Sequence, residues 1–252
     1  MNAKEKNLLV KKFRNKLKKK YILSGWMQIC SPEIAEILCQ KNFDAITLDL
    51  EHGSFGLEKL NNIFRAIEVK KKLSLVRLPN HKTDDLGQIF DSGCCGLIIP
   101  NIVNAKQVAK IINHSFWPPL GNRGVGFSRA NLYGKSFESY KRFKPVIVAM
   151  IENVKSLPNL DSILKIKNLD AILIGPYDLS ASLGSPGNFN NQKFKTSIKQ
   201  IRDKCKKFNK PVGIHVVEPS IKLLKARIRE GFKFLPFGID TVLLNKSLEI
   251  NF

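Results

Sequence analysis

The chain has 252 residues, 43% of them hydrophobic, and its 42 Lys and Arg outnumber 21 Asp and Glu to give a formal charge of +21 at pH 7. This length and apolar content suffice to bury a full core, as one large α/β domain or two small ones. No stretch approaches the roughly 20 continuous apolar residues of a membrane-spanning helix, so no membrane partner is expected.

The first predicted element is a basic amphipathic helix within residues 1–22. Leu8, Leu9, Phe13 and Leu17 recur near helical spacing, and lysines fill most positions between them. The segment lacks the apolar stretch of a secretory signal. A transit peptide is the less favoured alternative, because Lys outnumbers Arg and an acidic residue is present. We therefore predict a leading helix with a Lys-rich outer face.

Eight short apolar runs follow, and most are continuous rather than alternating, which is typical of parallel strands covered on both faces. Helical patterns separate most of them, and Ser31 followed by Pro32 is one clear helix start. The predicted strands are 24–29, 44–50, 73–78, 95–100, 146–151, 170–175, 212–217 and 233–238. The predicted helices are 32–41, 57–72, 83–93, 104–114, 153–168, 191–209 and 218–231.

This order of elements predicts an α/β fold, a single (β/α)₈ TIM barrel spanning 1–252. A doubly wound open sheet is the alternative, but no GxGxxG motif follows the first strand. The longest segment without periodicity, 115–137, lies between strands four and five. Because the loops after strands form the active-site face of a barrel, we expect this segment to be a functional loop there.

The cysteine content and the net charge limit which metals and binding partners are expected. The five cysteines form no CxxC pair and no Cys/His cluster, which favours reduced thiols in a cytoplasmic protein and argues against zinc. The charge of +21 is compatible with a polyanion partner, but the lysines are dispersed over separate elements. We therefore do not expect a nucleic-acid function, and expect the charge to attract anionic small substrates instead.

Polar side chains follow several predicted strands where a barrel would bring them together. They are Glu51, His52, Arg77, Glu152 and Asp178. Each has a purely structural alternative. Glu51 and His52 are then loop residues, and Arg77 belongs to a surface salt bridge. Glu152 is then the first-turn acid of a helix, and Asp178 is a helix N-cap. Together they favour a site at the carboxyl ends of the strands. Two carboxylates without a Cys/His cluster indicate an oxygen-ligated cation such as Mg²⁺ or Mn²⁺, with Co²⁺ as a further choice.

Several motifs resemble the HpcH/HpaI aldolase family, metal-dependent class II pyruvate aldolases with a (β/α)₈ barrel that are related to the citrate lyase β-subunit. The resemblance covers roughly residues 20–245. The motifs, in chain order, are "DAITLDLEHGSFG", "LVRLPN", "GLIIPNIVNAKQV", "PPLGNRGVGFSRANLYG", "IENVKSLPNLDSI" and "DAILIGPYDLSASLGSPGN".

The resemblance implies a role for each matching residue. Glu152 and Asp178 match the metal ligands, and Arg77 matches the arginine that contacts the keto or enolate oxygen. His52 matches the catalytic base, and Asp91 matches its carboxylate partner. The turn Gly175, Pro176 and Tyr177 matches the backbone that holds the pyruvate carboxylate. Residues 121–126, with Arg123 as a substrate-binding residue, match the long loop over the site.

The sequence departs from the family pattern at three places. Met150 stands where Gln is common, which removes a polar contact near the pyruvate site. Asn122 stands where a second Arg is common, which weakens the case for an acidic aldehyde as acceptor. The chain also ends soon after the eighth predicted strand, where the family has a longer helix that packs on a neighbouring subunit. A homo-oligomer, a trimer or hexamer, is still the expectation.

These residues predict an aldolase that cleaves a 4-hydroxy-2-oxo acid to pyruvate, or a close 2-oxo acid, and an aldehyde. The cation and Arg77 would stabilise the enolate, and His52 would take the hydroxyl proton. No predicted strand ends in Lys, which argues against a Schiff base. The alternatives are a CoA-ester lyase of the citrate or malyl-CoA lyase type, and a non-catalytic barrel that binds anions or RNA.

Overall fold

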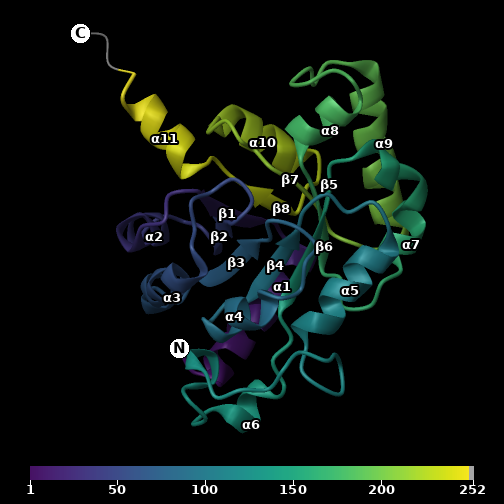
Figure 1. Ribbon diagram of the computed structural model, residues 1–252. Coiled ribbons are helices and arrows are strands. Elements are labelled where there is room, and N and C mark those ends of the chain that lie inside the picture. Colours follow the sequence, from purple (N-terminus) through teal and green to yellow (C-terminus); the bar gives the residue numbers. More distant parts are fainter. Residues whose placement is uncertain (250–252) are drawn as a thin grey trace.

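A computed structural model describes residues 1–249 (Figure 1). Eight parallel strands close into a barrel in chain order, and β8 pairs back with β1. The predicted (β/α)₈ fold is confirmed. The strands are β1 (Ile22–Met27), β2 (Ala45–Asp49), β3 (Leu73–Arg77), β4 (Gly96–Ile99), β5 (Val146–Ile151), β6 (Ala171–Ile174), β7 (Val212–Ile214) and β8 (Phe234–Pro236).

Nearly every strand residue is buried, because one face fills the barrel and the other packs under the helices. This explains why the strands are continuous apolar runs. The register aligns the last residues of neighbouring strands, so that Asp49 of β2 lies beside Arg77 of β3. Polar residues that end apolar strands therefore collect at one rim of the barrel.

The outer layer consists of α-helices and short 3₁₀ segments. The α-helices are α1 (Ala3–Lys19), α2 (Pro32–Cys39), α3 (Leu60–Val69), α4 (Leu86–Asp91), α5 (Ala105–Ser115), α6 (Phe137–Tyr140), α7 (Leu160–Leu164), α8 (Pro176–Ser182), α9 (Gln192–Lys207), α10 (Ile221–Arg229) and α11 (Asp240–Ser247). The 3₁₀ segments are η1 (Leu57–Lys59), η2 (Arg129–Asn131) and η3 (Val154–Asn159). No helix within residues 1–249 is long and apolar enough to cross a membrane.

Two helix predictions were too long. The segment 153–168 divides into η3 and α7, because Pro158 removes a backbone donor in the middle of it. The segment 83–93 forms a helix only as α4, and Gly93 then adopts a positive φ of 116°. Helices α6 and α11 were not predicted as separate elements, since they have only four and eight residues.

Helix α1 covers the end of the barrel at which the strands begin. Phe13 packs against Phe234, the first residue of β8, with ring centroids 6.1 Å apart. Arg14 binds Asp170 just before β6, with Nε 2.7 Å from a carboxylate oxygen. The predicted leading helix is therefore confirmed. Its buried face differs from the prediction, since Leu8 is 51% exposed and Lys6 is buried.

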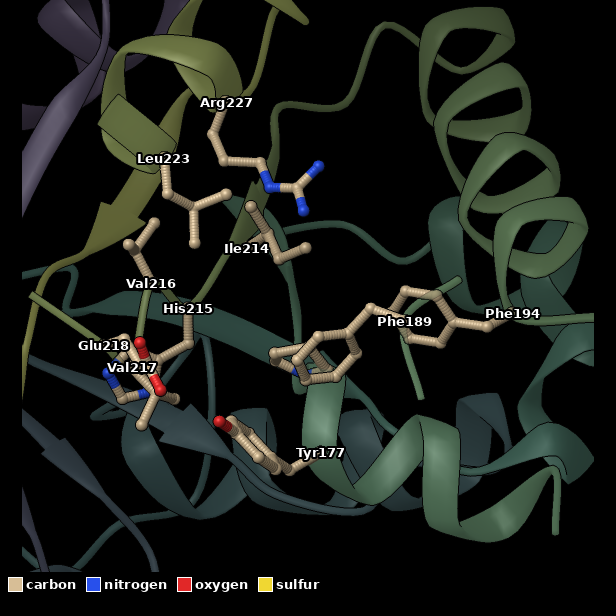
Figure 2. A pocket seen from close by; sticks show the side chains of 11 residues that line it. Tyr177, Phe189, Phe194, Ile214, His215, Val216, Val217, Glu218, Leu223 and Arg227 are labelled. Carbon is tan, nitrogen blue, oxygen red and sulfur yellow. The ribbon is translucent and has the colours of Figure 1, made fainter. Parts of the chain in front are cut away.

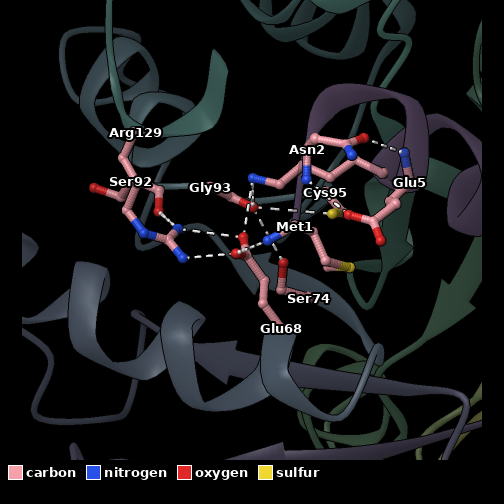
Figure 3. A network of polar contacts seen from close by, with 10 residues as sticks. Met1, Asn2, Glu5, Glu68, Ser74, Ser92, Gly93, Cys95 and Arg129 are labelled. Atoms are coloured by element: carbon pink, nitrogen blue, oxygen red, sulfur yellow. Dashed lines mark hydrogen bonds and ion pairs between the residues drawn. The ribbon is translucent and has the colours of Figure 1, made fainter. Parts of the chain in front are cut away.

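A buried ionic cluster ties α1 to α3 and to the segment before α6 (Figure 3). The Glu68 carboxylate of α3 lies 3.0 Å from Lys6 Nζ, 2.7 Å from Arg129 Nη2 and 2.9 Å from the amino group of Met1. Lys6 is 1% exposed and also donates to the carbonyl of Gly93 at 3.3 Å. These contacts fix three segments that are far apart in sequence at the amino-terminal end of the barrel.

The long segment 116–136 lies at this same end, so its predicted position was wrong. It follows helix α5 rather than a strand, and each helix returns the chain to the end where strands begin. Its Arg129 belongs to the Glu68 cluster, which confirms this location independently. Figure 1 accordingly shows α6 and the N-terminus at the end opposite α8, α10 and α11.

Candidate active site

Asp49 and Arg77 form a buried ion pair at the carboxyl ends of β2 and β3. Arg77 donates from Nε at 2.8 Å and from Nη2 at 2.6 Å to the two carboxylate oxygens. Asp49 is fully buried and also accepts from Trp26 Nε1 at 3.1 Å and Gln28 Nε2 at 3.0 Å. Burial opposes ionisation, but the hydrogen bonds and charge of Arg77 lower the pKa of Asp49 to about 2. Arg77 is thus held in one orientation.

The "EHG" turn continues directly from Asp49. The Asp49 carboxylate accepts from the backbone N–H groups of Glu51 and His52 at 3.1 and 3.2 Å. Glu51 contacts Nη1 of Arg77 at 2.9 Å, and burial raises the pKa of Glu51 despite this charge. A side chain at Gly53 would meet the Asp49 carbonyl at 2.3 Å, so the turn requires glycine. The ring of His52 is exposed beside this frame.

Glu152 follows the last residue of β5 and is 5% exposed. One carboxylate oxygen accepts from the backbone N–H of Asn101 at 2.6 Å, whereas the other is buried without a partner within the described residues. Burial, reinforced by the charges of Asp178 and Glu51, raises the pKa of Glu152 to about 7 despite the Asn101 hydrogen bond. An unpartnered buried carboxylate oxygen is costly unless a cation or donor binds it.

The turn after β6 faces this oxygen. A Cβ on Gly175 would lie 2.4 Å from Glu152 Oε2 and 2.7 Å from Met150 Cε, so only glycine leaves the oxygen accessible. Pro176 is the first residue of α8, Tyr177 is 42% exposed, and Asp178 lies in the first turn. The thioether of Met150 therefore borders the site with an apolar surface.

These carboxylates fit a hard divalent cation. No group of three His, Cys, Asp or Glu residues within 1–249 converges closely enough to form a complete protein cage. Mg²⁺ and Mn²⁺ do not need one, since they accept one or two carboxylates together with water and substrate oxygens. The orphaned oxygen of Glu152, coupled electrostatically to Asp178 and Glu51, has the chemistry of such a donor set.

Two predicted site residues lie elsewhere in this chain. Asp91 is the last residue of α4, at the amino-terminal end of the barrel, and accepts from Ser128 Oγ at 3.2 Å rather than from His52. Arg123 is buried there, with its guanidinium 4.8 Å from the ring centroid of Phe90 and a 3.3 Å hydrogen bond to the Tyr140 hydroxyl. The pairing of Asp91 with His52 is therefore not formed within one chain, because helix α4 runs away from the strand ends.

Two residues of the site, Trp26 and His215, were not predicted to contribute. The ring of Trp26 lies 5.1 Å from the Arg77 guanidinium and 4.4 Å from the ring of His215. Burial lowers the pKa of His215 to about 4, so this imidazole is neutral. Nothing in the sequence distinguishes Trp26 and His215 from other buried strand residues.

A parallel barrel with carboxylates and an oriented arginine at the carboxyl ends of its strands is typical of enzymes that stabilise an oxyanion. A family model described as HpcH/HpaI aldolase/citrate lyase matches residues 23–247. A 2-keto-3-deoxy-L-rhamnonate aldolase from Escherichia coli O6:K15:H31 (strain 536 / UPEC) is 30% identical, and the match covers 99% of this chain and 93% of that relative. A similar relative from Salmonella typhi is 29% identical, with the same coverage.

Solved structures of the same family resemble this chain over most of its length. An HpcH/HpaI aldolase from Desulfitobacterium hafniense DCB-2 has 25% identity and a TM-score of 0.80, covering 90% of each chain. A family protein from Burkholderia cenocepacia J2315 has 21% identity and a TM-score of 0.88, covering 94% of this chain and 95% of that one. The chain belongs to the HpcH/HpaI aldolase/citrate lyase family. It is a class II aldolase, an enzyme of the carbon–carbon lyase class, in a metal-dependent family.

Proposed function

We propose that the enzyme cleaves a 4-hydroxy-2-oxo acid to pyruvate, or a close 2-oxo acid, and an aldehyde. The observation that carries the proposal is the buried, unpartnered oxygen of Glu152, whose carboxylate is coupled to Asp178 and faces the rim that holds Arg77. The names of the relatives support it, since a 2-keto-3-deoxy-L-rhamnonate aldolase acts on a substrate of this class.

Glu152 and Asp178 would hold Mg²⁺ or Mn²⁺, with Co²⁺ as a further choice. When bound, the cation supplies positive charge for the oxygen that becomes an enolate. Glu152 is suited to this role because its second oxygen is buried and free. Gly175 is suited to the turn beside it because any side chain there would cover that oxygen.

Arg77 would donate to the oxo oxygen of the substrate. Its two bonds to Asp49 fix the guanidinium plane before the substrate arrives, so that little reorganisation is needed as negative charge develops. Gly175, Pro176 and Tyr177 would receive the substrate carboxylate at the start of α8, where the backbone N–H of Tyr177 has no helical partner. These contacts orient the 2-oxo acid half of the substrate.

His52 would remove the proton from the 4-hydroxyl group, which allows the carbon–carbon bond to break. An exposed imidazole at the rim can reach a substrate that enters from solvent. Its backbone is fixed by Asp49, the same carboxylate that orients Arg77. One buried acid thus positions both the proposed base and the proposed oxyanion donor.

Asp91 and Arg123 retain their proposed roles only in a homo-oligomer, where one copy supplies them to the site of another. The segment that carries Arg123, whose Ser128 also donates to Asp91, exposes apolar side chains, with Phe127 73% and Val125 54% exposed, as an interface would require. A trimer or a hexamer is the proposed assembly. Residues 1–252 are proposed to form one domain without a nucleic-acid partner. A cytoplasmic location is proposed because the five cysteines are free.

The test is metal-dependent turnover without a covalent intermediate. Purified enzyme is treated with EDTA and assayed for pyruvate release from 4-hydroxy-2-oxo acids before and after Mn²⁺ is restored. We expect activity to vanish and return, and borohydride with pyruvate to leave the protein mass unchanged. Full turnover of a preparation that contains no detectable metal would refute the assignment.

A further inference from the structure

The Asp49 carboxylate lies at the centre of the proposed site, because it fixes both the Arg77 guanidinium and the backbone of His52. Two further side chains donate to this carboxylate. Trp26 of β1 and Gln28, just after β1, both donate to its Oδ2 oxygen. Such additional donors stop the carboxylate from rotating, so they also fix the groups that it holds. The two donors are themselves held in different ways.

Trp26 is held mainly by packing. Its ring lies 4.4 Å from the ring of His215, measured between centroids. His215 also lines a cavity of about 280 Å³ between α8, α9 and α10, as Figure 2 shows. Replacing Trp26 would remove a large buried ring from this region, so the loss of packing and the loss of the hydrogen bond to Asp49 would occur together. Trp26 is therefore unsuited to a test of how Asp49 is held.

Gln28 is held instead by polar contacts with the first turn of α11. The Asp240 carboxylate accepts from the backbone N–H groups of Gln28 and Ile29 at 2.8 and 2.9 Å, which fixes the chain where it leaves β1. Thr241 donates from Oγ1 to Gln28 Oε1 at 3.1 Å. Because Oε1 accepts from this hydroxyl, the amide presents Nε2 to Asp49, at 3.0 Å. The start of α11 therefore sets the orientation of the Gln28 amide.

We infer that Gln28 is a positioning residue for the aldol reaction and that Thr241 acts on the same reaction through Gln28. The inference rests on the proposed function, because it takes Arg77 as the donor to the oxo oxygen and His52 as the base. Gln28 Nε2 is already bound to Asp49, so it acts through this carboxylate and needs no contact with the substrate. Two hydrogen bonds thus connect Asp49 with α11, which extends away from the barrel in Figure 1.

The loss of these hydrogen bonds should reduce turnover more than substrate binding. An Arg77 that is less firmly held can still bind the substrate, but it is no longer fixed where negative charge develops in the transition state. Gln28→Met keeps the length of the side chain and removes both polar atoms. We expect kcat for pyruvate release to fall about 10–100-fold, as for other residues that orient a functional group, with KM within about twofold of wild type. Thr241→Val should lower kcat about three- to tenfold, because it removes one hydrogen bond further from the site.

The double variant provides the decisive measurement. If Thr241 acts through Gln28, the enzyme with both Gln28→Met and Thr241→Val should have the same kcat as Gln28→Met alone, because the hydroxyl then has no amide to orient. Thr241→Ser keeps the hydroxyl and should keep the wild-type kcat. The matched control is Thr196→Val, at an exposed threonine of α9, which should change neither kcat nor KM. All variants are assayed with Mn²⁺, and calorimetric titration should give each of them the wild-type affinity for Mn²⁺.

Methyl-proton exchange of pyruvate in D₂O separates failure of this inference from failure of the proposed function. Two results would overturn the inference alone, in an enzyme whose wild type exchanges protons and releases pyruvate. One is a wild-type kcat for Gln28→Met, and the other is a double variant in which the losses from the two substitutions multiply. Wild-type enzyme that neither exchanges protons nor releases pyruvate from any 4-hydroxy-2-oxo acid would overturn the aldolase assignment itself.

Discussion

Glu152 and Asp178 are proposed to bind the cation, whereas His52 is proposed to move a proton, and single substitutions separate these roles. Asp178→Asn removes a charged ligand, so Mn²⁺ affinity should fall at least tenfold together with activity. His52→Ala should retain Mn²⁺ affinity and lose about 10²–10⁴-fold in turnover, the range for a positioned acid–base group. Calorimetric Mn²⁺ titration and a pyruvate-release assay measure the two effects.

The control for these substitutions is Glu138→Gln on α6, an acid 80% exposed and distant from the strand ends. It should change neither quantity. If His52→Ala cleaves substrate at the wild-type rate, His52 is only part of the rim, and the base must be another group.

His215 makes folding sensitive to mild acid. Its pKa is about 4 in the folded protein because burial disfavours the charged ring, against an ordinary value of 6.5. Between these values the unfolded chain binds the additional proton, so stability is complete above pH 6.5 and decreases as the pH falls toward 4. The difference corresponds to about 3 kcal/mol in the free energy of unfolding.

Urea denaturation at several pH values tests this. The wild-type free energy of unfolding should decrease by about 3 kcal/mol more than that of His215→Gln between pH 7 and pH 4. Gln retains a donor for the Gly238 carbonyl, which the ring contacts at 3.2 Å. Parallel curves for the two proteins would show that another group controls the acid response.

At the scale of elements, the apolar strands were predictable and the exact ends of the helices were not. A strand that is buried on both faces leaves a continuous apolar run, which is why the segments 44–50 and 146–151 nearly match β2 and β5. Short helices such as α6 are defined by turn geometry and contacts with neighbours rather than by periodicity. The same holds for the site. Arg77 and Glu152 were predictable because they lie at strand ends, whereas the role of Trp26 is visible only from its packing in the structure.

The misplacement of 116–136 has a further cause. A predicted helix at 104–114 already implied that the following segment lies where strands begin. The motif suggested a loop over the active site, and a family motif does not state which copy of a chain it acts on. Topology therefore decides the position of Arg123 and Asp91, and the motif alone cannot.

The Glu68 cluster is expected to hold α1, α3 and η2 together. Glu68→Gln leaves the buried Lys6 and the partly buried Arg129 without their counterion, and breaking a buried pair typically costs about 3–5 kcal/mol. The midpoint of urea denaturation should fall accordingly, with an unchanged m-value. Lys141→Gln, which breaks the exposed pair with Glu138, is the matched control and should leave the midpoint unchanged. Equal midpoints for Glu68→Gln and wild type would contradict this function of the cluster.

At the scale of the whole molecule, the two ends of the barrel are proposed to meet only between copies. Chains with Glu152→Gln lack a ligand but keep Asp91, and chains with Asp91→Asn have the reverse defect. If Asp91 serves a neighbouring site, co-expressed chains should recover about one quarter of wild-type activity, because half the sites keep Glu152 and half of those face an intact Asp91.

Activity of the co-expressed oligomers, purified through one tag that both variants carry, measures this recovery, and light scattering gives their mass. Each variant alone should be nearly inactive. A monomeric protein, or mixed oligomers as inactive as the separate variants, would exclude a shared site. Full activity of Asp91→Asn alone would remove Asp91 from the chemistry altogether.

The charge of +21 is the last property of the whole molecule that calls for a test. A basic cleft with a volume of about 700 Å³ lies at the amino-terminal end of the barrel. Its cations are Lys18, Arg202, Lys206, Lys210 and Lys233, and the acids Asp203 and Glu230 interrupt them. We expect no specific nucleic-acid site there, since the positive groups do not form an uninterrupted track and no row of exposed aromatic side chains accompanies them in this cleft.

Binding of a labelled single-stranded RNA, followed by fluorescence anisotropy, should be weak and should disappear between about 50 and 200 mM salt, as sequence-independent phosphate contacts do. Replacing Lys18 and Lys206 with Gln should reduce the slope of log K against log salt by about 1–2, equally for every RNA sequence. Nanomolar affinity for one RNA sequence at physiological salt would instead establish a nucleic-acid function beside the enzymatic one.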